Sequence, residues 1–222
     1  MLRKLLKLNN FVKATSTHEF NYAMEFAQET LEEESKKENK ILILNYMLDV
    51  IREDLKSDLL SQIFYCEKYS SKKINFPFPY NFYNKEGEEL NFSPEEEKIK
   101  VDLAENCVLV LPWHRKRMRD NIKNIYRNEF MFDKQNHLAY FFTHIDICYV
   151  YNGNHSIASG IVFKRGCIEA KKYDVSKLFK HVYTDGSSWY NSHNDKKIAK
   201  LFDFRIGIIY EISKLKYELE IT

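Results

Sequence analysis

The sequence has few of the residues that interrupt or crosslink a chain. Its 222 residues include six glycines, four prolines and four cysteines. The cysteines are far apart and form no Cys-x-x-Cys pair, which argues against a disulfide framework or a zinc site. All four are predicted to be buried, reduced thiols of an intracellular protein: Cys66, Cys107, Cys148 and Cys167.

Long apolar runs and an excess of charge are also missing. No run approaches the length that a bilayer crossing needs, and residues 1–7 are too charged for a secretory signal. The expectation is a cytoplasmic protein without membrane contact. A formal net charge of only +2 argues against a general nucleic-acid coat, although a local basic patch remains compatible with it.

Several signatures of chemistry are absent as well. The sequence contains no GxxxxGK[ST] phosphate loop, no GxGxxG, no GxSxG and no HExxH. His137, His144, His181 and His193 do not have the spacing of a compact ligand set, so no metal site is expected.

The N-terminal part of the chain, residues 1–70, has a helical pattern. Phe20, Met24, Ala27 and Leu31 recur on one helical face, and after a polar break at residues 32–40 a second stripe begins. That stripe comprises Leu44, Met47, Leu48, Ile51, Leu55 and Leu59. It must pack on the rest of the chain or on a partner, which includes a second copy in a homo-oligomer.

Residues 71–100 have the composition of a connector. Prolines at 77 and 79 exclude a helix, and the aromatic side chains around them favour a connector laid across the core over a peptide-binding surface.

Residues 101–222 alternate between strand and helix patterns. Strands are predicted at residues 107–111, 141–151 and 167–173, and helices at 116–130, 156–164 and 175–183. Residues 204–219 fit either a strand or a last helix. His144 and Asp146 alternate onto one side of the second strand. The expected fold is α+β or α/β, a helical region followed by a small mixed-sheet domain.

The sharpest local feature is the turn formed by Gly153, Asn154, His155 and Ser156. A β-rich run ends there and small residues at helical spacing come next. The start of a helix leaves backbone N–H groups unpaired, so this turn is predicted to bind phosphate, with His155 as donor or general acid–base. The alternative is that Asn154 caps the helix and His155 satisfies a carbonyl.

The order of these elements resembles the ParB/sulfiredoxin-like nucleotide-binding domain over about residues 108–175. The family turn reads G-x-[HR]-R before a helix with an alanine, and Gly153, Asn154, His155 and Ala158 match it. Two positions depart from the family. Ser156 stands where the family usually has arginine, and Asn154 stands where sulfiredoxins carry their catalytic cysteine, which excludes sulfiredoxin chemistry.

The resemblance implies that the turn holds nucleotide phosphates and that the segment after the first strand approaches them. His114, Arg115 and Arg117 are therefore candidate phosphate ligands, since arginine can grip phosphate with two hydrogen bonds. A basic face further along the same helix is a candidate nucleic-acid surface or an ordinary solvated face: Arg119, Lys123 and Arg127, together with Lys116.

The loop at residues 183–190 is a candidate lid. Asp185 is a possible catalytic base or magnesium ligand, and Trp189 or Tyr190 could stack on a base. The favoured alternative is that Asp185 and Gly186 make a turn and that Trp189 is core.

Together these features predict a protein that binds the phosphate of a nucleotide (ATP or CTP) or of a nucleic acid. The expected cofactor is Mg²⁺ with the nucleotide, and the expected reaction, if there is one, is phosphoryl transfer or phosphate-ester hydrolysis. A phage, plasmid or defence-associated origin fits the small size and the AT-rich residue usage. The alternatives are a non-catalytic interaction module, acting through the N-terminal helices, and a DNA-binding accessory factor.

Overall fold

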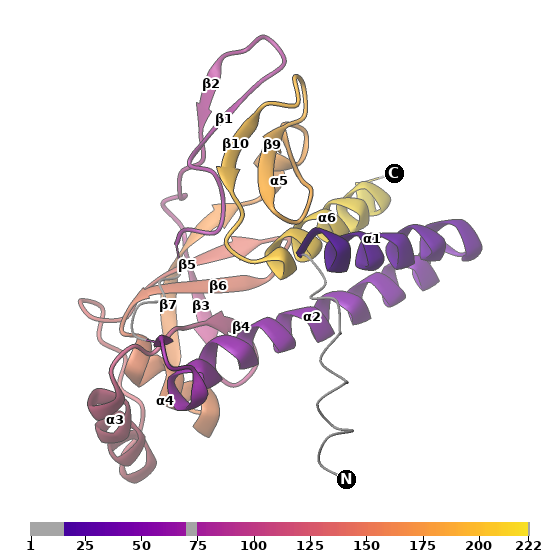
Figure 1. Cartoon of the computed structure of the whole chain (residues 1–222). Coiled ribbons are helices and arrows are strands. Elements are labelled where there is room, and N and C mark those ends of the chain that lie inside the picture. Colours follow the sequence, from indigo (N-terminus) through magenta and orange to yellow (C-terminus); the bar gives the residue numbers. More distant parts are fainter. Residues whose placement is uncertain (1–15, 70–74, 222) are drawn as a thin grey trace, which may run out of the picture.

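A mixed five-stranded sheet forms the centre of the molecule (Figure 1). The computed structural model describes residues 16–69 and 75–221. The sheet order is β3-β7-β5-β6-β4, and β4 and β6 are parallel, as are β5 and β7. The strands are β3 (Lys98–Asp102), β4 (Cys107–Leu109), β5 (Leu138–Thr143), β6 (Ile147–Asn152) and β7 (Cys167–Asp174). With its helices this is an α+β fold, as the sequence predicts.

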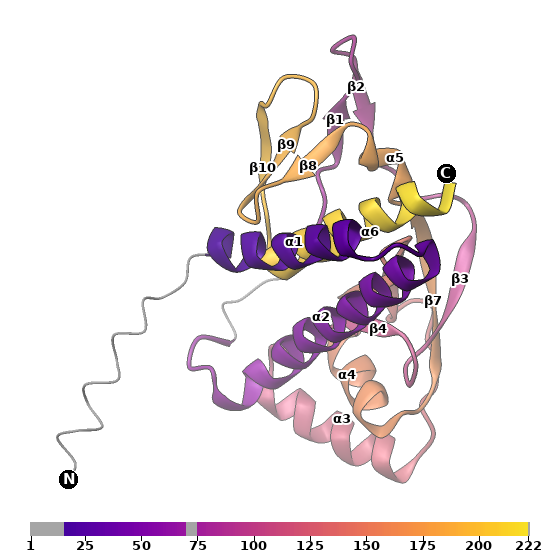
Figure 2. The same ribbon diagram turned by 90° about the vertical axis from the view of Figure 1, so that its right-hand side faces the viewer.

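The N-terminal helices pack on the C-terminal one. α1 (Ser16–Glu33) contacts α6 (Phe204–Ile221), and α2 (Lys37–Tyr65) contacts both α6 and β4 (Figure 2). The predicted stripe of α2 is buried, with Leu44, Leu48, Leu55 and Leu59 at most 3% exposed. The stripe therefore packs on this chain's own sheet and last helix.

Residues 204–219 form a helix. The isoleucines at 206, 208, 209 and 212 are all buried, so α6 is apolar around most of its circumference. A helix of this kind has no amphipathic period, which is why its pattern also fitted a strand.

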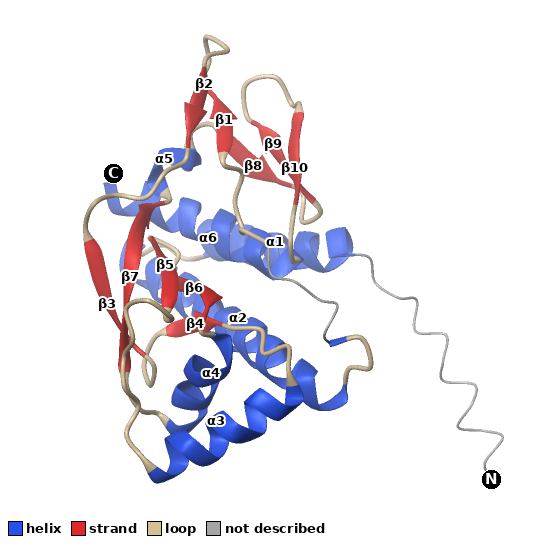
Figure 3. Ribbon diagram, turned by 90° about the vertical axis from the view of Figure 1, so that its left-hand side faces the viewer, coloured by secondary structure: helices blue, strands red, loops and turns tan. Residues whose placement is uncertain are grey.

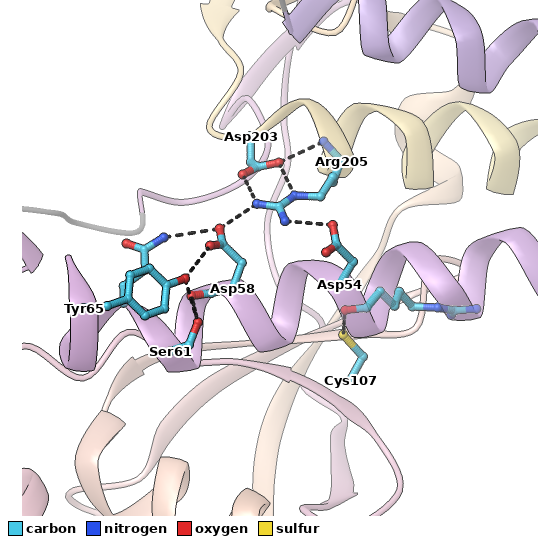
Figure 4. A network of polar contacts seen from close by, with 9 residues as sticks. Asp54, Asp58, Ser61, Tyr65, Cys107, Asp203 and Arg205 are labelled. Atoms are coloured by element: carbon cyan, nitrogen blue, oxygen red, sulfur yellow. Dashed lines mark hydrogen bonds and ion pairs between the residues drawn. The ribbon is translucent and has the colours of Figure 1, made fainter. Parts of the chain in front are cut away.

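A mostly buried arginine side chain ties α6 to α2. Arg205 donates to Asp54 and Asp58 of α2, at 2.9 and 2.8 Å, and to Asp203 at the start of its own helix (Figure 4). Burial alone would lower the pKa of Arg205, but the hydrogen bonds to these carboxylates outweigh it and raise the pKa. The cluster is a structural ion-pair network, because Arg205 engages all three carboxylates.

The two faces of the sheet carry two cores. On one face Phe141, Cys148 and Val150 pack with α4 (Asn154–Phe163) and with Met118 of α3 (Arg115–Arg127). On the other face Phe142, Tyr149 and Tyr173 join the larger core that α2 and α6 share. α3 and α4 lie side by side beneath the sheet (Figure 3).

The segment expected to be a connector crosses the larger core. Phe78 is buried against Phe142, with ring centroids 4.9 Å apart, and the indole of Trp189 donates to Pro77 O at 3.1 Å. The segment also contains regular structure that the sequence pattern missed. It carries the hairpin β1 (Asn81–Tyr83) and β2 (Glu89–Asn91), and β3 starts at Lys98, inside the expected range.

Two predicted elements are wrong in their extent. Residues 141–151 are the antiparallel hairpin of β5 and β6, and His144 and Asp146 lie in its turn with φ of 67° and 51°. They do not alternate on a strand. The expected helix at residues 175–183 is only α5 (Ser176–Phe179), followed by β8 (Val182–Thr184), β9 (Ser188–Asn191) and β10 (Lys197–Lys200).

The cysteines are free and only half of them match the expected burial. Cys107 and Cys148 are buried, and burial raises the pKa of the Cys107 thiol to about 12. Cys66 and Cys167 are partly exposed, because they stand at the ends of α2 and of the loop before β7. No helix in the described part of the chain combines the length and apolar character of a membrane span.

Candidate anion-binding site

The turn between β6 and α4 requires glycine. Gly153 has a φ of 86°, in the left-handed region, and a Cβ there would lie 2.7 Å from His137 Cδ2. Only glycine adopts this conformation without strain and tolerates so close a neighbour. The turn therefore directs the chain from the strand into α4 within one residue.

This turn leaves backbone donors unpaired. The N–H of Ile157 donates to Gly153 O at 3.1 Å, which closes the first turn of α4. Within the described residues, the N–H groups of Asn154, His155 and Ser156 have no acceptor. Together with the helix dipole, these donors make the start of α4 attractive to an anion.

α3 begins at the same place. The N–H of Leu111 donates to Asn154 Oδ1 at 2.9 Å, and the N–H of His114 donates to His155 Nε2 at 3.0 Å. At the other end, the guanidinium of Arg165 donates to Ile125 O and Tyr126 O of α3. α3 and α4 therefore run in the same direction, and their positive ends converge.

A small polar pocket lies at this convergence. Its volume is about 210 Å³, and it is lined by residues 152–156 together with Trp113, Arg117, Asn121, Asn136 and Tyr151. The guanidinium carbon of Arg117 lies 5.3 Å from the centre of the Trp113 ring. Among the described residues no carboxylate pairs with Arg117, so its charge is available to a ligand.

His155 holds the two helix starts together. Its side chain is 8% exposed, and burial, followed by the nearby Arg117 and His114, lowers its pKa to about 4. Because Nε2 accepts from the His114 backbone, the ring is neutral at pH 7 and its lone pair is in use. The geometry gives His155 a positioning role and leaves no free lone pair for the predicted acid–base role.

Ser156 is held from the opposite side. Its hydroxyl donates to Gly153 O at 3.1 Å and lies 2.8 Å from His137 Nε2. The N–H of Asp133 donates to His137 Nδ1 at 3.0 Å, so Nε2 carries the proton and donates to Ser156. The Ser156 side chain is thus satisfied within the protein, and Ser156 contributes its backbone N–H to the pocket.

Of the three predicted phosphate ligands, His114, Arg115 and Arg117, only Arg117 lines the pocket. Arg117 lines the pocket, whereas Arg115 donates to Ile63 O at 3.0 Å and lies over the Tyr69 ring at 4.6 Å. His114 caps α3, with its Nδ1 accepting from the N–H of Arg117 at 3.2 Å. Arg115 is thus turned toward the end of α2, because positions 115 and 117 are about 200° apart on a helix.

The weaker nucleic-acid candidates lie on the outer face of α3. Arg119, Lys123 and Arg127 are exposed, and Lys123 pairs with Asp120 at 2.9 Å. None of the three lines the pocket.

Asp185 is not part of this site. It lies in the turn between β8 and β9, where Gly186 packs against Phe20 of α1. Burial alone would raise its pKa, but hydrogen bonds donated by Ser187 and Ser188 outweigh this and lower it. Trp189 is 1% exposed and belongs to the core, and Asp185 and Gly186 form a turn, as the favoured alternative predicts.

Residues 7–222 match the model of a family of unknown function (DUF6710). The chain belongs to this family. Searches of the curated proteins and of the solved structures gave no match. The family description assigns no activity, so the resemblance to the ParB/sulfiredoxin-like domain stays a prediction.

Sequence reasoning missed several walls of the pocket. Asn121, Asn136 and Tyr151 come from three different elements, and only their positions in space bring them together. A signal did exist for Asn121, which comes four residues after Arg117 and so shares its helical face. Asn136 gives no such signal, because the loop before β5 has no periodicity.

A larger hollow of about 720 Å³ lies between β1 and β10. Its lysines, Lys196 and Lys197, stand at a short edge strand with an irregular register. Lysines and bulges on an edge strand are the usual protection against unwanted strand pairing. In residues 16–69 and 75–221, no group of three or more His, Cys, Asp or Glu is placed to hold a metal ion.

Proposed function

We propose that the pocket between the starts of α3 and α4 binds a phosphate group of a nucleotide or of a nucleic acid. The observation that carries this proposal is the convergence of two helix N-termini on a pocket that also contains Arg117. Unpaired N–H groups, two positive dipole ends and a guanidinium are complementary to a tetrahedral anion.

The same site supports binding better than turnover. The side chains that line the pocket include no carboxylate, and His155 is neutral with its Nε2 lone pair in use. Phosphoryl transfer needs a base or a positioned water and, in most cases, Mg²⁺. On this proposal, Mg²⁺ would arrive with the nucleotide.

A thermal-shift panel tests the proposal. The ligands are ATP, CTP, GTP, their diphosphates and short DNA, each with and without Mg²⁺. A ligand bound only by the folded state at about 100 times its Kd stabilises by about 2.7 kcal/mol, which raises the melting temperature by roughly 5 to 10 °C.

Arg117→Ala should remove this shift, because it deletes the guanidinium of the pocket. Arg119→Ala is the matched control, since it removes an arginine from the outer face of the same helix. No shift with any phosphate ligand, or an equal shift in Arg117→Ala, would overturn the proposal.

A second candidate is self-association through α2. Leu42, Tyr46 and Val50 lie along one exposed face of this helix and are 68, 70 and 51% exposed. Solvent-exposed apolar residues at spacings of four are typical of a helix that meets another protein surface. Analytical ultracentrifugation of wild type and Tyr46→Lys tests it, and a wild-type monomer at high concentration would exclude it.

A further inference from the structure

We infer that the ligand of this pocket is a mononucleotide whose base stacks on Tyr151. The inference rests on the proposed phosphate site and adds the part of the ligand that lies outside it. Tyr151 lines the pocket and is 40% exposed. It precedes Gly153 by two residues, which is roughly 7 Å along a strand. That separation suits the sugar that joins a base to its phosphate.

One face of the Tyr151 ring is covered by a neighbouring ring. It stacks on Tyr140 with centroids 4.6 Å apart and an interplanar angle of 26°. Tyr140 in turn meets the buried Tyr173 edge-on at 5.0 Å. A ring that is fixed before binding loses little conformational freedom when a base stacks on it.

The other aromatic wall is less suited to a base. Trp113 meets His155 edge-on at 5.5 Å, and the guanidinium of Arg117 lies over its ring. Asn152 and Asn136 line the same pocket as Tyr151, with Asn152 Nδ2 donating to Asn136 Oδ1 at 3.4 Å, and amide groups of this kind can pair with the edge of a base.

The size of the pocket and the position of the cations favour a mononucleotide over a polymer. About 210 Å³ is less than the 300 to 1,000 Å³ that encloses a whole drug-sized ligand, so the base must lie at the rim. Arg119 and Lys123 each come two positions after a pocket residue, Arg117 and Asn121, or about 200° around the helix. A polymer backbone that leaves the pocket would not meet this basic face.

Calorimetry with AMP, CMP and ribose 5-phosphate tests the inference. Wild type should bind the nucleotides about tenfold or more tightly than ribose 5-phosphate, because stacking of a base on an aromatic ring contributes a factor of this size. Tyr151→Leu should abolish that difference and keep the affinity for ribose 5-phosphate. Tyr151→Phe should retain the difference, and Tyr22→Leu, at an exposed tyrosine of α1, should change nothing.

The outcomes separate this inference from the proposed function. Equal binding of AMP and ribose 5-phosphate by wild type, or an unchanged difference in Tyr151→Leu, would overturn the inference alone. A short single-stranded DNA that binds much more tightly than AMP, with the gain lost in Arg119→Ala/Lys123→Ala, would also overturn it. No binding of any phosphate ester would overturn both.

Discussion

The turns at Gly153 and Gly186 are similar in sequence and differ in the donors that they leave open. Both glycines have a left-handed φ, 86° and 82°, and each follows an Asn or Asp residue, Asn152 and Asp185. At Gly186, the Asp185 carboxylate accepts from the N–H groups of Ser187 and Ser188, at 2.8 and 2.9 Å. At Gly153, the corresponding donors open into the pocket.

The difference arises from the element that each turn leads into. β9 pairs with β8 directly after Gly186, so the donors of that turn are enclosed by a hairpin. α4 begins directly after Gly153, and the first N–H groups of a helix point out along its axis. A polar glycine turn is therefore a site only where its donors remain unpaired, which the hydrogen bonds of the fold decide.

Lowering the pH should protonate His155 at the pocket before it protonates Asp185 in the turn between β8 and β9. The pKa of His155 is about 4 in the fold against 6.5 for an ordinary histidine, so the unfolded chain binds more protons between these values. The contribution of His155 to the free energy of unfolding is fully present above about pH 6.5. It is lost as the pH falls toward 4, and the loss is on the order of 3 kcal/mol. Burial also lowers the pKa of His137 and His181, which adds to the loss.

Asp185 responds in a lower range. Its pKa lies below the ordinary 3.8, so its contribution is present above pH 3.8 and is lost only below it. Urea unfolding at pH 7, 6 and 5 checks the comparison, and His155→Gln should flatten the dependence. Constant wild-type stability over this range would contradict the assignment.

Alanine at either glycine should destabilise the fold by about 2 to 3 kcal/mol, from backbone strain and a clash. The new Cβ would lie 2.7 Å from His137 Cδ2 at Gly153 and 2.4 Å from Phe20 Cβ at Gly186. Gly87→Ala is the matched control, since its φ is 83° and no atom lies within 4 Å, so it should cost about 1 kcal/mol. An equal loss of stability in all three variants would show that the clash of the new Cβ contributes nothing to the loss.

Asp185→Ala should lower stability and leave ligand binding intact, whereas Arg117→Ala should lower ligand binding and leave stability intact. Asp185→Ala leaves two backbone donors unpaired and should cost about 1 to 2 kcal/mol of stability, with ligand binding unchanged. Arg117→Ala should lose binding while the fold stays close to wild type. Denaturation and calorimetry on both variants check this, and weaker binding in Asp185→Ala would refute the separation of the two turns.

The smallest effect is expected on the outer face of α3. Arg119→Ala/Lys123→Ala should leave both the melting temperature and the nucleotide affinity as in wild type, because neither side chain reaches the pocket. A tenfold loss of nucleotide affinity would place the basic face in the site.

Elements with a clear period could be predicted from the sequence. The amphipathic stripe of α2, the basic helix α3 and the turn at Gly153 lie where the pattern places them. The turn between β5 and β6 gave no signal, because its left-handed residues are His144 and Asp146, and non-glycine residues rarely adopt this conformation. The strands β8, β9 and β10 are three or four residues long, too short to establish a period.

The features of the candidate site also fall into those that the sequence determined and those that only the tertiary structure decided. The sequence by itself determined the α+β class, the glycine turn at 153 and the start of a helix after it, because these depend on local conformation. It grouped Arg115 and Arg117 together as candidate phosphate ligands, although two residues span about 200° around a helix. Only the tertiary structure decided which arginine reaches the pocket and which donors stay unpaired, because both depend on how α3 packs beside α4 and on the segments that supply acceptors.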